Sequence, residues 1–206
     1  MKNIDINKHY VINPAYKFRS DIKRVVLTNN KSLYCNNYDH LCDDFTTNYA
    51  MIMHPMVAKL FSSFDGSRSF KDIAVELSEI LAVPVPEVIE TFSQYINNPE
   101  KVNYRLSDKH YAPIPKNFLI EKNNCPTRKL LSNADINKII SEGIDVETMR
   151  YYIPNEIMLM LTNKCMTNCV YCYADTKHQV KNHLSMERIK ELITEAHILG
   201  CRDFGI

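Results

Sequence analysis

Three cysteines lie within eight residues near the end of the sequence, directly after an apolar run, and this combination constrains the fold most. The run is Glu156-Ile-Met-Leu-Met-Leu-Thr162, and the cysteines are Cys165, Cys169 and Cys172. A nearly continuous apolar run of this length is typical of a strand buried on both faces, as in parallel sheets. We therefore expect a parallel sheet here, with the cysteines on the loop that follows its first strand.

A helix and a second strand are expected after the cysteine loop. Ser185 is suited to cap a helix that carries an apolar stripe and stops at Gly200, and Asp203-Phe-Gly-Ile206 has the pattern of a strand. Strand, loop, helix and strand make a βαβ unit. One such unit does not form a stable sheet layer by itself. We therefore expect a fragment, a truncated product, or a protein that completes its sheet with a partner.

The spacing of the cysteines is C-x3-C-x2-C, and it indicates an iron–sulfur site. Three thiolates can hold three irons of a [4Fe–4S] cluster and leave the fourth iron without a protein ligand. An open position is what activation of a substrate or cofactor requires, as at a catalytic zinc. A partial zinc site and plain core thiols are the alternatives. Cys201 follows the helix stop, and we expect it to pack as a small apolar residue.

At these residues the sequence resembles the radical S-adenosylmethionine (SAM) superfamily, which carries C-x3-C-x-aromatic-C after the first strand of a partial (β/α)6 barrel. The resemblance covers about residues 150–206. It implies that Cys165, Cys169 and Cys172 bind [4Fe–4S], that the open iron binds SAM, and that Tyr171 lies beside the adenine. It also implies an external electron donor and cleavage of SAM to a 5′-deoxyadenosyl radical. The Gly-Gly-Glu-like segment usual after the family's second strand would begin about where Ile206 ends the sequence.

The sequence before the cysteine loop divides into three predicted parts. Residues 1–22 are polar and are expected to form a loosely attached arm. Residues 23–106 have the order of strands, three short helices and a final strand, which favours a winged-helix-like α+β domain. Residues 107–155, interrupted by prolines, are expected to form a linker, and residues 156–206 begin the incomplete α/β barrel. On this division, residues 1–110 should fold alone.

The elements expected within residues 23–106 follow from apolar spacing and from turn residues. Strands are predicted at 23–28, 31–36, 48–53 and 101–106, and helices at 55–64, 69–81 and 87–97. His54 precedes the first helix and is expected to cap it or to face solvent. Ser69 with Asp72 resembles a capping box at the second helix.

The helix, Asp65-Gly66 turn, helix, helix pattern resembles the PqqD-like domain that recognises the leader of a ribosomally made precursor peptide. The resemblance implies that the leader adds as a strand to the sheet edge and packs against the third helix. The residues of this expected groove are Tyr49, Met51, Met53, Ile89 and Phe92. Packing of these side chains in the core is the alternative for each of them. DNA binding by a winged helix is disfavoured, because the third helix contains Glu87 and Glu90 and no Lys or Arg.

Composition limits the remaining classes of function. The chain has 25 Lys and Arg against 24 Asp and Glu, so a dominant nucleic-acid-binding role is not expected. No apolar run approaches the length of a membrane span, and the polar N-terminus lacks the core of a secretory signal. Seven cysteines, an odd number, argue against a complete disulfide framework. We therefore expect a cytoplasmic protein. The two resemblances together imply a role in radical SAM peptide maturation, with the chain inactive by itself. The alternative is a non-catalytic leader-binding module with a vestigial barrel segment.

Overall fold

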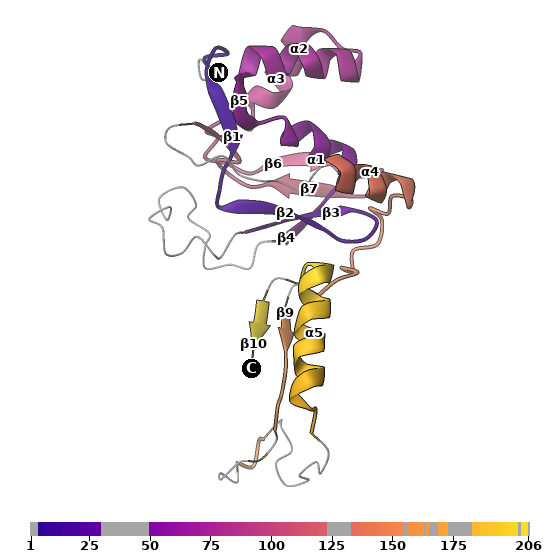
Figure 1. Ribbon diagram of the computed structural model, residues 1–206. Helices are drawn as coiled ribbons and strands as arrows, with labels where there is room; N and C mark the ends of the chain where they lie inside the picture. Colours follow the sequence, from indigo (N-terminus) through magenta and orange to yellow (C-terminus); the bar gives the residue numbers. More distant parts are fainter. Residues whose placement is uncertain are drawn as a thin grey trace. The chain divides into compact units, whose positions relative to one another are not determined.

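The structure is a computed structural model of the chain, and it divides into two compact units, residues 1–150 and 151–206 (Figure 1). The described residues are 4–29, 50–122, 133–154, 156–162, 164, 169–172, 183–201 and 203–205. Across these residues the fold is mixed α/β, with small antiparallel sheets in the first unit and one parallel strand pair in the second. None of the strands in this part of the chain closes into a barrel.

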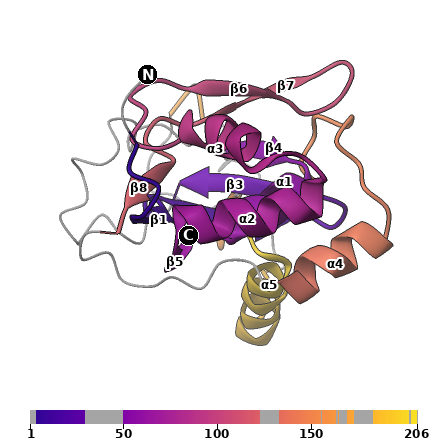
Figure 2. The same ribbon diagram turned by 90° about the horizontal axis from the view of Figure 1, so that it is seen from above.

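The centre of the first unit is a three-stranded antiparallel sheet in the order β2-β3-β4. Its strands are β2 (Tyr16–Ser20), β3 (Val25–Asn29) and β4 (Ala50–Met53). Val25 is opposite Met53 and Leu27 is opposite Met51. The helices α1, α2 and α3 lie over one face of this sheet (Figure 2). The predicted strand at 31–36 lies outside the described residues.

Three helices follow β4, and side-chain caps set the starts of the first two. They are α1 (Pro55–Ser62), α2 (Phe70–Leu81) and α3 (Val85–Ser93). The Oγ of Ser69 accepts a hydrogen bond from the Asp72 N–H at 3.2 Å, which confirms the predicted cap of α2. The Ser69 hydroxyl also donates to the Asp72 carboxylate at 2.6 Å, so the pair closes on itself rather than forming the usual capping box.

A second sheet, in the order β5-β1-β8, joins distant parts of the first unit. It contains β1 (His9–Ile12), β5 (Asp65–Ser69) and β8 (Leu119–Glu121). A separate hairpin pairs β6 (Val102–Arg105) with β7 (Tyr111–Ile114), and α4 (Asn133–Ser141) follows. The Asp65-Gly66 turn therefore continues as a strand, which the sequence pattern did not predict.

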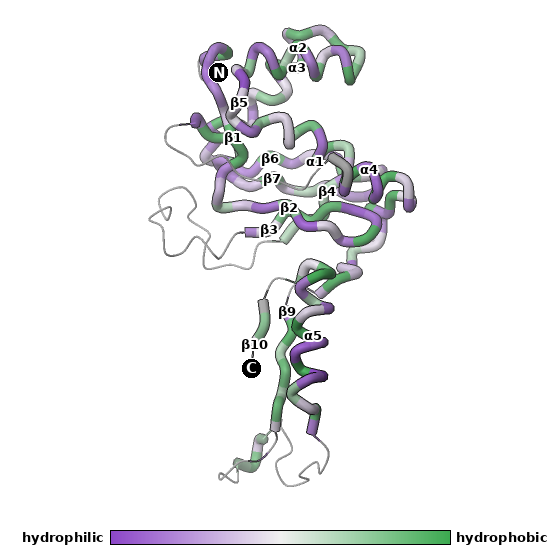
Figure 3. The backbone as a smooth tube through the Cα atoms, viewed as in Figure 1, coloured by the Kyte–Doolittle hydropathy of each residue, from purple (hydrophilic) through white to green (hydrophobic). Residues whose placement is uncertain are grey.

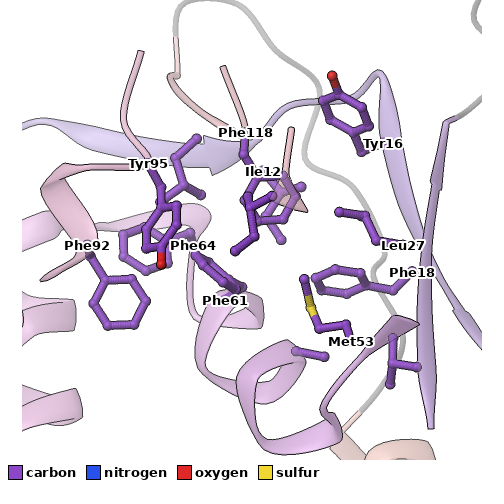
Figure 4. Close-up of a cluster of buried hydrophobic side chains, with 14 of the residues drawn as sticks. Ile12, Tyr16, Phe18, Leu27, Met53, Phe61, Phe64, Phe92, Tyr95 and Phe118 are labelled. Carbon is purple, nitrogen blue, oxygen red and sulfur yellow. The ribbon is translucent and has the colours of Figure 1, made fainter. Parts of the chain in front are cut away.

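Aliphatic and aromatic side chains form the core of the first unit, and several of its aromatic rings contact one another (Figure 4). Phe61 on α1 contacts Phe92, Tyr95 and Phe118, with ring centroids 5.5, 5.2 and 4.9 Å apart. All three contacts are edge-to-face, an arrangement that adds to the gain from burial. One residue on α1 therefore joins α3 to the segment that leads into β8.

The arm and the linker expected from the sequence are both parts of this core. Residues 1–22 supply β1 and β2; apolar residues alternate with charged ones in β2, and Tyr10, Ile12 and Tyr16 are buried. Ile114 and Phe118 from the expected linker are fully buried. Composition misled the prediction, because short strands bury alternate residues and can remain polar on average. The folded unit therefore begins earlier and extends further than residues 23–106.

A buried ion pair lies between the start and the end of the first unit. Arg24 donates from Nε to the Asp21 carboxylate at 2.9 Å, and both side chains are fully buried. The same guanidinium also donates to the backbone carbonyls of Thr148 and Arg150. The turn between β2 and β3 thus holds the segment that ends the unit.

The second unit is a βαβ arrangement of β9 (Glu156–Met158), α5 (Met186–Leu199) and β10 (Asp203–Gly205). The strands pair in parallel, with Ile157 opposite Phe204. Green, hydrophobic colour runs along β9 in Figure 3, yet the Met158 side chain is 71% exposed. In the part of the chain that the structure describes, no helix is long and apolar enough to cross a membrane.

Candidate functional site

The cysteine loop begins beyond the carboxyl end of β9. The parallel ladder continues one step past β9, because the Leu159 N–H donates to the Gly205 carbonyl at 2.9 Å. The strand is shorter than the predicted 156–162, because the paired part of β10 ends at Gly205. The Oγ1 of Thr162 accepts from the Lys164 N–H at 3.0 Å, which bends the chain just before the first cysteine.

Two of the three predicted ligands are described, and they flank a single turn. The Cys172 N–H donates to the Cys169 carbonyl at 3.3 Å, and both residues are half-buried. Between them, Val170 is 93% exposed and Tyr171 is 86% exposed. Cys165 lies outside the described residues. The turn brings two thiol-bearing residues together, as a shared metal centre requires.

The helix that follows the loop starts and stops as predicted. The Oγ of Ser185 accepts from the Arg188 N–H at 3.2 Å, and Gly200 ends α5 in the left-handed region at φ 88°. His183, just before this helix, is exposed.

Cys201 is separated from the other cysteines by the topology of the unit. It is 8% exposed and lies between α5 and β10, at the amino end of that strand. Cys169 and Cys172 follow the carboxyl end of β9. Since the two strands are parallel, these ends lie on opposite sides of the unit. Cys201 is therefore not placed to complete a four-cysteine site with them.

The candidate metal site has three thiolates as its donor set. Among the described residues, no group of three His, Cys, Asp or Glu side chains is arranged to hold a metal ion. Two of the three cysteines can be examined, and they share one turn. A turn that carries Cys169 and Cys172 on one loop is compatible with a centre that takes its ligands from that loop.

The predicted peptide groove is for the most part filled by the core of the first unit. Met51, Met53 and Phe92 are 5%, 0% and 4% exposed. In Figure 4, Phe61 lies between Phe92 and Met53. Ile89 is half-buried, and Tyr49 lies outside the described residues. Met51 and Met53 therefore contribute their side chains to the core, and only the backbone of β4 lies at the edge of the sheet that the structure describes.

The residue that contacts this edge is Tyr104 on β6, which the sequence pattern did not single out. Its hydroxyl accepts from the His54 N–H at 3.1 Å and donates to the Ile52 carbonyl at 3.4 Å. Burial raises the pKa of this phenol well above its usual value. A tyrosine in a predicted short strand gives no local signal that its hydroxyl reaches a strand about 50 residues away.

His54 has a structural role at the same junction. Its Nδ1 accepts from the Met56 N–H at 3.2 Å and caps α1, which confirms the capping alternative. Burial lowers the pKa of its imidazole below the usual value. The neutral ring that the cap needs is therefore the favoured form in the folded chain.

Comparison of the chain with protein-family models, curated proteins and solved structures found no match.

Proposed function

We propose that the chain supplies the peptide-recognition domain and the cluster loop of a radical SAM enzyme that modifies a ribosomally made peptide. The observation that carries this proposal is the cysteine loop at the carboxyl end of β9 in a βαβ unit. Ligands of parallel α/β sheets bind at the carboxyl ends of the strands. Cys165, Cys169 and Cys172 would hold a [4Fe–4S] cluster, and Tyr171 would lie beside the adenine of SAM.

The chemistry that such a centre supplies is one-electron reduction of bound SAM, with the electron taken from an external donor. The protein's own contribution is to present three thiolates from one loop and to leave one position open for SAM. An oxygen-sensitive cluster and reduced thiols suit the cytoplasm. The acidic residues Glu87 and Glu90 on α3 give no support to binding of nucleic acid.

The arrangement of the first unit supports the peptide part of the proposal. The sheet β2-β3-β4 is followed by three helices, and β4 is an edge strand among the described residues. An edge strand can accept an extended peptide as an additional strand. The same feature also favours the second candidate, a leader-binding module without catalysis, because peptide binding needs only the first unit.

Anaerobic reconstitution of the 206-residue chain with iron and sulfide tests the metal site. We expect labile, oxygen-sensitive loading that SAM perturbs, measured by iron content and electron paramagnetic resonance after reduction. Alanine at Cys165, Cys169 or Cys172 should abolish the signal, whereas Cys201→Ala, the matched control, should keep it. Zinc without iron in the isolated protein, or iron retained in the triple variant, would overturn the assignment. A cluster signal that does not respond to SAM, together with peptide binding by the chain, would favour the non-catalytic module.

A further inference from the structure

The register of the central sheet determines which backbone groups of β4 face its outer edge. In an antiparallel strand, the N–H and C=O of one residue point to the same side, and neighbouring residues alternate. The Ile52 carbonyl and the His54 N–H are both bonded to the Tyr104 hydroxyl, which lies outside the β2-β3-β4 sheet. Ala50, Ile52 and His54 therefore face outward, whereas Met51 and Met53 face Leu27 and Val25 on β3.

Tyr104 occupies two of these outward groups from the β6–β7 hairpin. Its hydroxyl bonds the His54 N–H at 3.1 Å and the Ile52 carbonyl at 3.4 Å. Tyr104 is opposite Ala112 in the β6–β7 ladder, and Ala112 and Ile114 on β7 are 4% and 0% exposed. The hydroxyl thus donates and accepts at the edge, as the backbone of a fourth strand would.

We propose that Tyr104 is an intramolecular plug of the β4 edge, which an extended peptide must displace to add as the fourth strand. This inference rests on the proposed peptide-binding function and adds a control to the same site. The incoming strand would take over the Ile52 carbonyl and the His54 N–H. Tyr104 would then turn its hydroxyl to water, and the β6–β7 hairpin, whose strand β7 contacts β4, would move away from the edge with it.

If Tyr104 blocks the edge, its substitution should change the affinity for peptide in a definite direction. Binding of a peptide to the natural chain breaks the two bonds of the Tyr104 hydroxyl. Tyr104→Phe has no such bonds to break, and it leaves two edge groups unsatisfied until the peptide arrives. The variant should therefore bind peptide about fivefold more tightly, the factor that corresponds to one net hydrogen bond.

The test uses the full chain and labelled synthetic leader peptides, taken from the short open reading frames beside the gene. Fluorescence anisotropy titrations compare the natural chain, Tyr104→Phe and the matched control Tyr111→Phe. Tyr111 lies on the same hairpin and is 69% exposed. We expect tighter binding by Tyr104→Phe alone. Equal or weaker binding by Tyr104→Phe would overturn the plug and leave the peptide role standing, whereas no binding by any of the three would overturn both.

A second measurement needs no substitution that could disturb folding. The natural chain is labelled with 3-fluorotyrosine, and the Tyr104 resonance is assigned from its loss in Tyr104→Phe or, if that variant does not fold, from site-specific incorporation at position 104. Added leader peptide should move the resonance to the position of a solvent-exposed tyrosine. A peptide that binds without moving it would show that binding occurs elsewhere, and would overturn the plug.

Discussion

The two units of the chain differ in how much apolar side-chain surface each buries. The first unit surrounds Phe61 with aromatic rings and leaves residues such as Phe64 and Phe118 with no exposed surface. In the described part of the second unit, the buried residues are Ile153, Ile189, Ala196 and Cys201. Met158 and Ile198 there are 71% and 77% exposed. The first unit thus carries its own stability, whereas the second presents a loop and leaves apolar surface uncovered.

Truncation of the chain should have the largest effect, because it tests whether the first unit folds by itself. A fragment of residues 1–150 should unfold cooperatively, because it keeps all the strands and helices of the first unit. A fragment of residues 1–110, expected from the sequence to fold, should fail, because it loses β8 and the fully buried Phe118. Circular dichroism and urea titration measure both outcomes. Cooperative unfolding of the shorter fragment would show that β8 is dispensable.

Removal of one buried ring should show how much more the free energy of unfolding depends on the first unit than on the second. Phe61→Ala empties a site that contacts three other rings, and it should lower the free energy of unfolding by about 3–5 kcal/mol. The control Ile198→Ala removes an exposed side chain from the second unit and should change it by less than about 0.5 kcal/mol. Urea denaturation measures both variants. A loss of similar size in the two would contradict the contrast in burial.

Substitutions at two glycines of the first unit distinguish the cost of backbone strain from the cost of close packing. Gly66 and Gly143 have positive φ values of 78° and 91°. A Cβ at Gly66 would lie 2.6 Å from Cγ1 of Val11, whereas a Cβ at Gly143 would meet nothing within 4 Å. Gly66→Ala should therefore cost about 1–3 kcal/mol more than Gly143→Ala in thermal unfolding. Equal costs would mean that the β1–β5 contact relaxes easily.

The smallest effect expected is the pH dependence at His54. Because burial lowers its pKa, the unfolded chain takes up this proton more readily than the folded chain. The contribution of His54 should be complete above its ordinary pKa of 6.5 and should decrease as the pH falls below it. His54→Asn keeps an acceptor for the Met56 N–H and should remove this dependence, whereas His54→Ala should cost about 1 kcal/mol at neutral pH. Identical pH profiles for His54→Asn and the natural chain, by urea titration, would contradict this role.

What the sequence could predict depends on how local the determinant is. The starts of α2 and α5 were predictable, because Ser69 and Ser185 bond backbone groups three residues away. The strand β5 was missed, because Asp65-Gly66 has the composition of a turn and its partner β1 lies far away in sequence.

The same distinction applies to the candidate sites. The spacing of the cysteines is a local property and could be found from the sequence. The burial of Met51 and Phe92 and the contact of Tyr104 with β4 depend on how helices and the hairpin pack. Periodicity predicts that a side chain faces inward, but it does not predict which residues that side chain contacts.

The clamp formed by Arg24 has a consequence for synthesis of the chain. Its guanidinium bonds carbonyls 124 and 126 residues further along, and β1 pairs with β8 across most of the same unit. Contacts of such sequence separation form slowly, because a long loop must close first. The clamp therefore cannot form until residue 150 has emerged from the ribosome, whereas the pairing of β2 with β3 needs only the residues up to Asn29. The first unit therefore completes its folding only after its last segment has been synthesised.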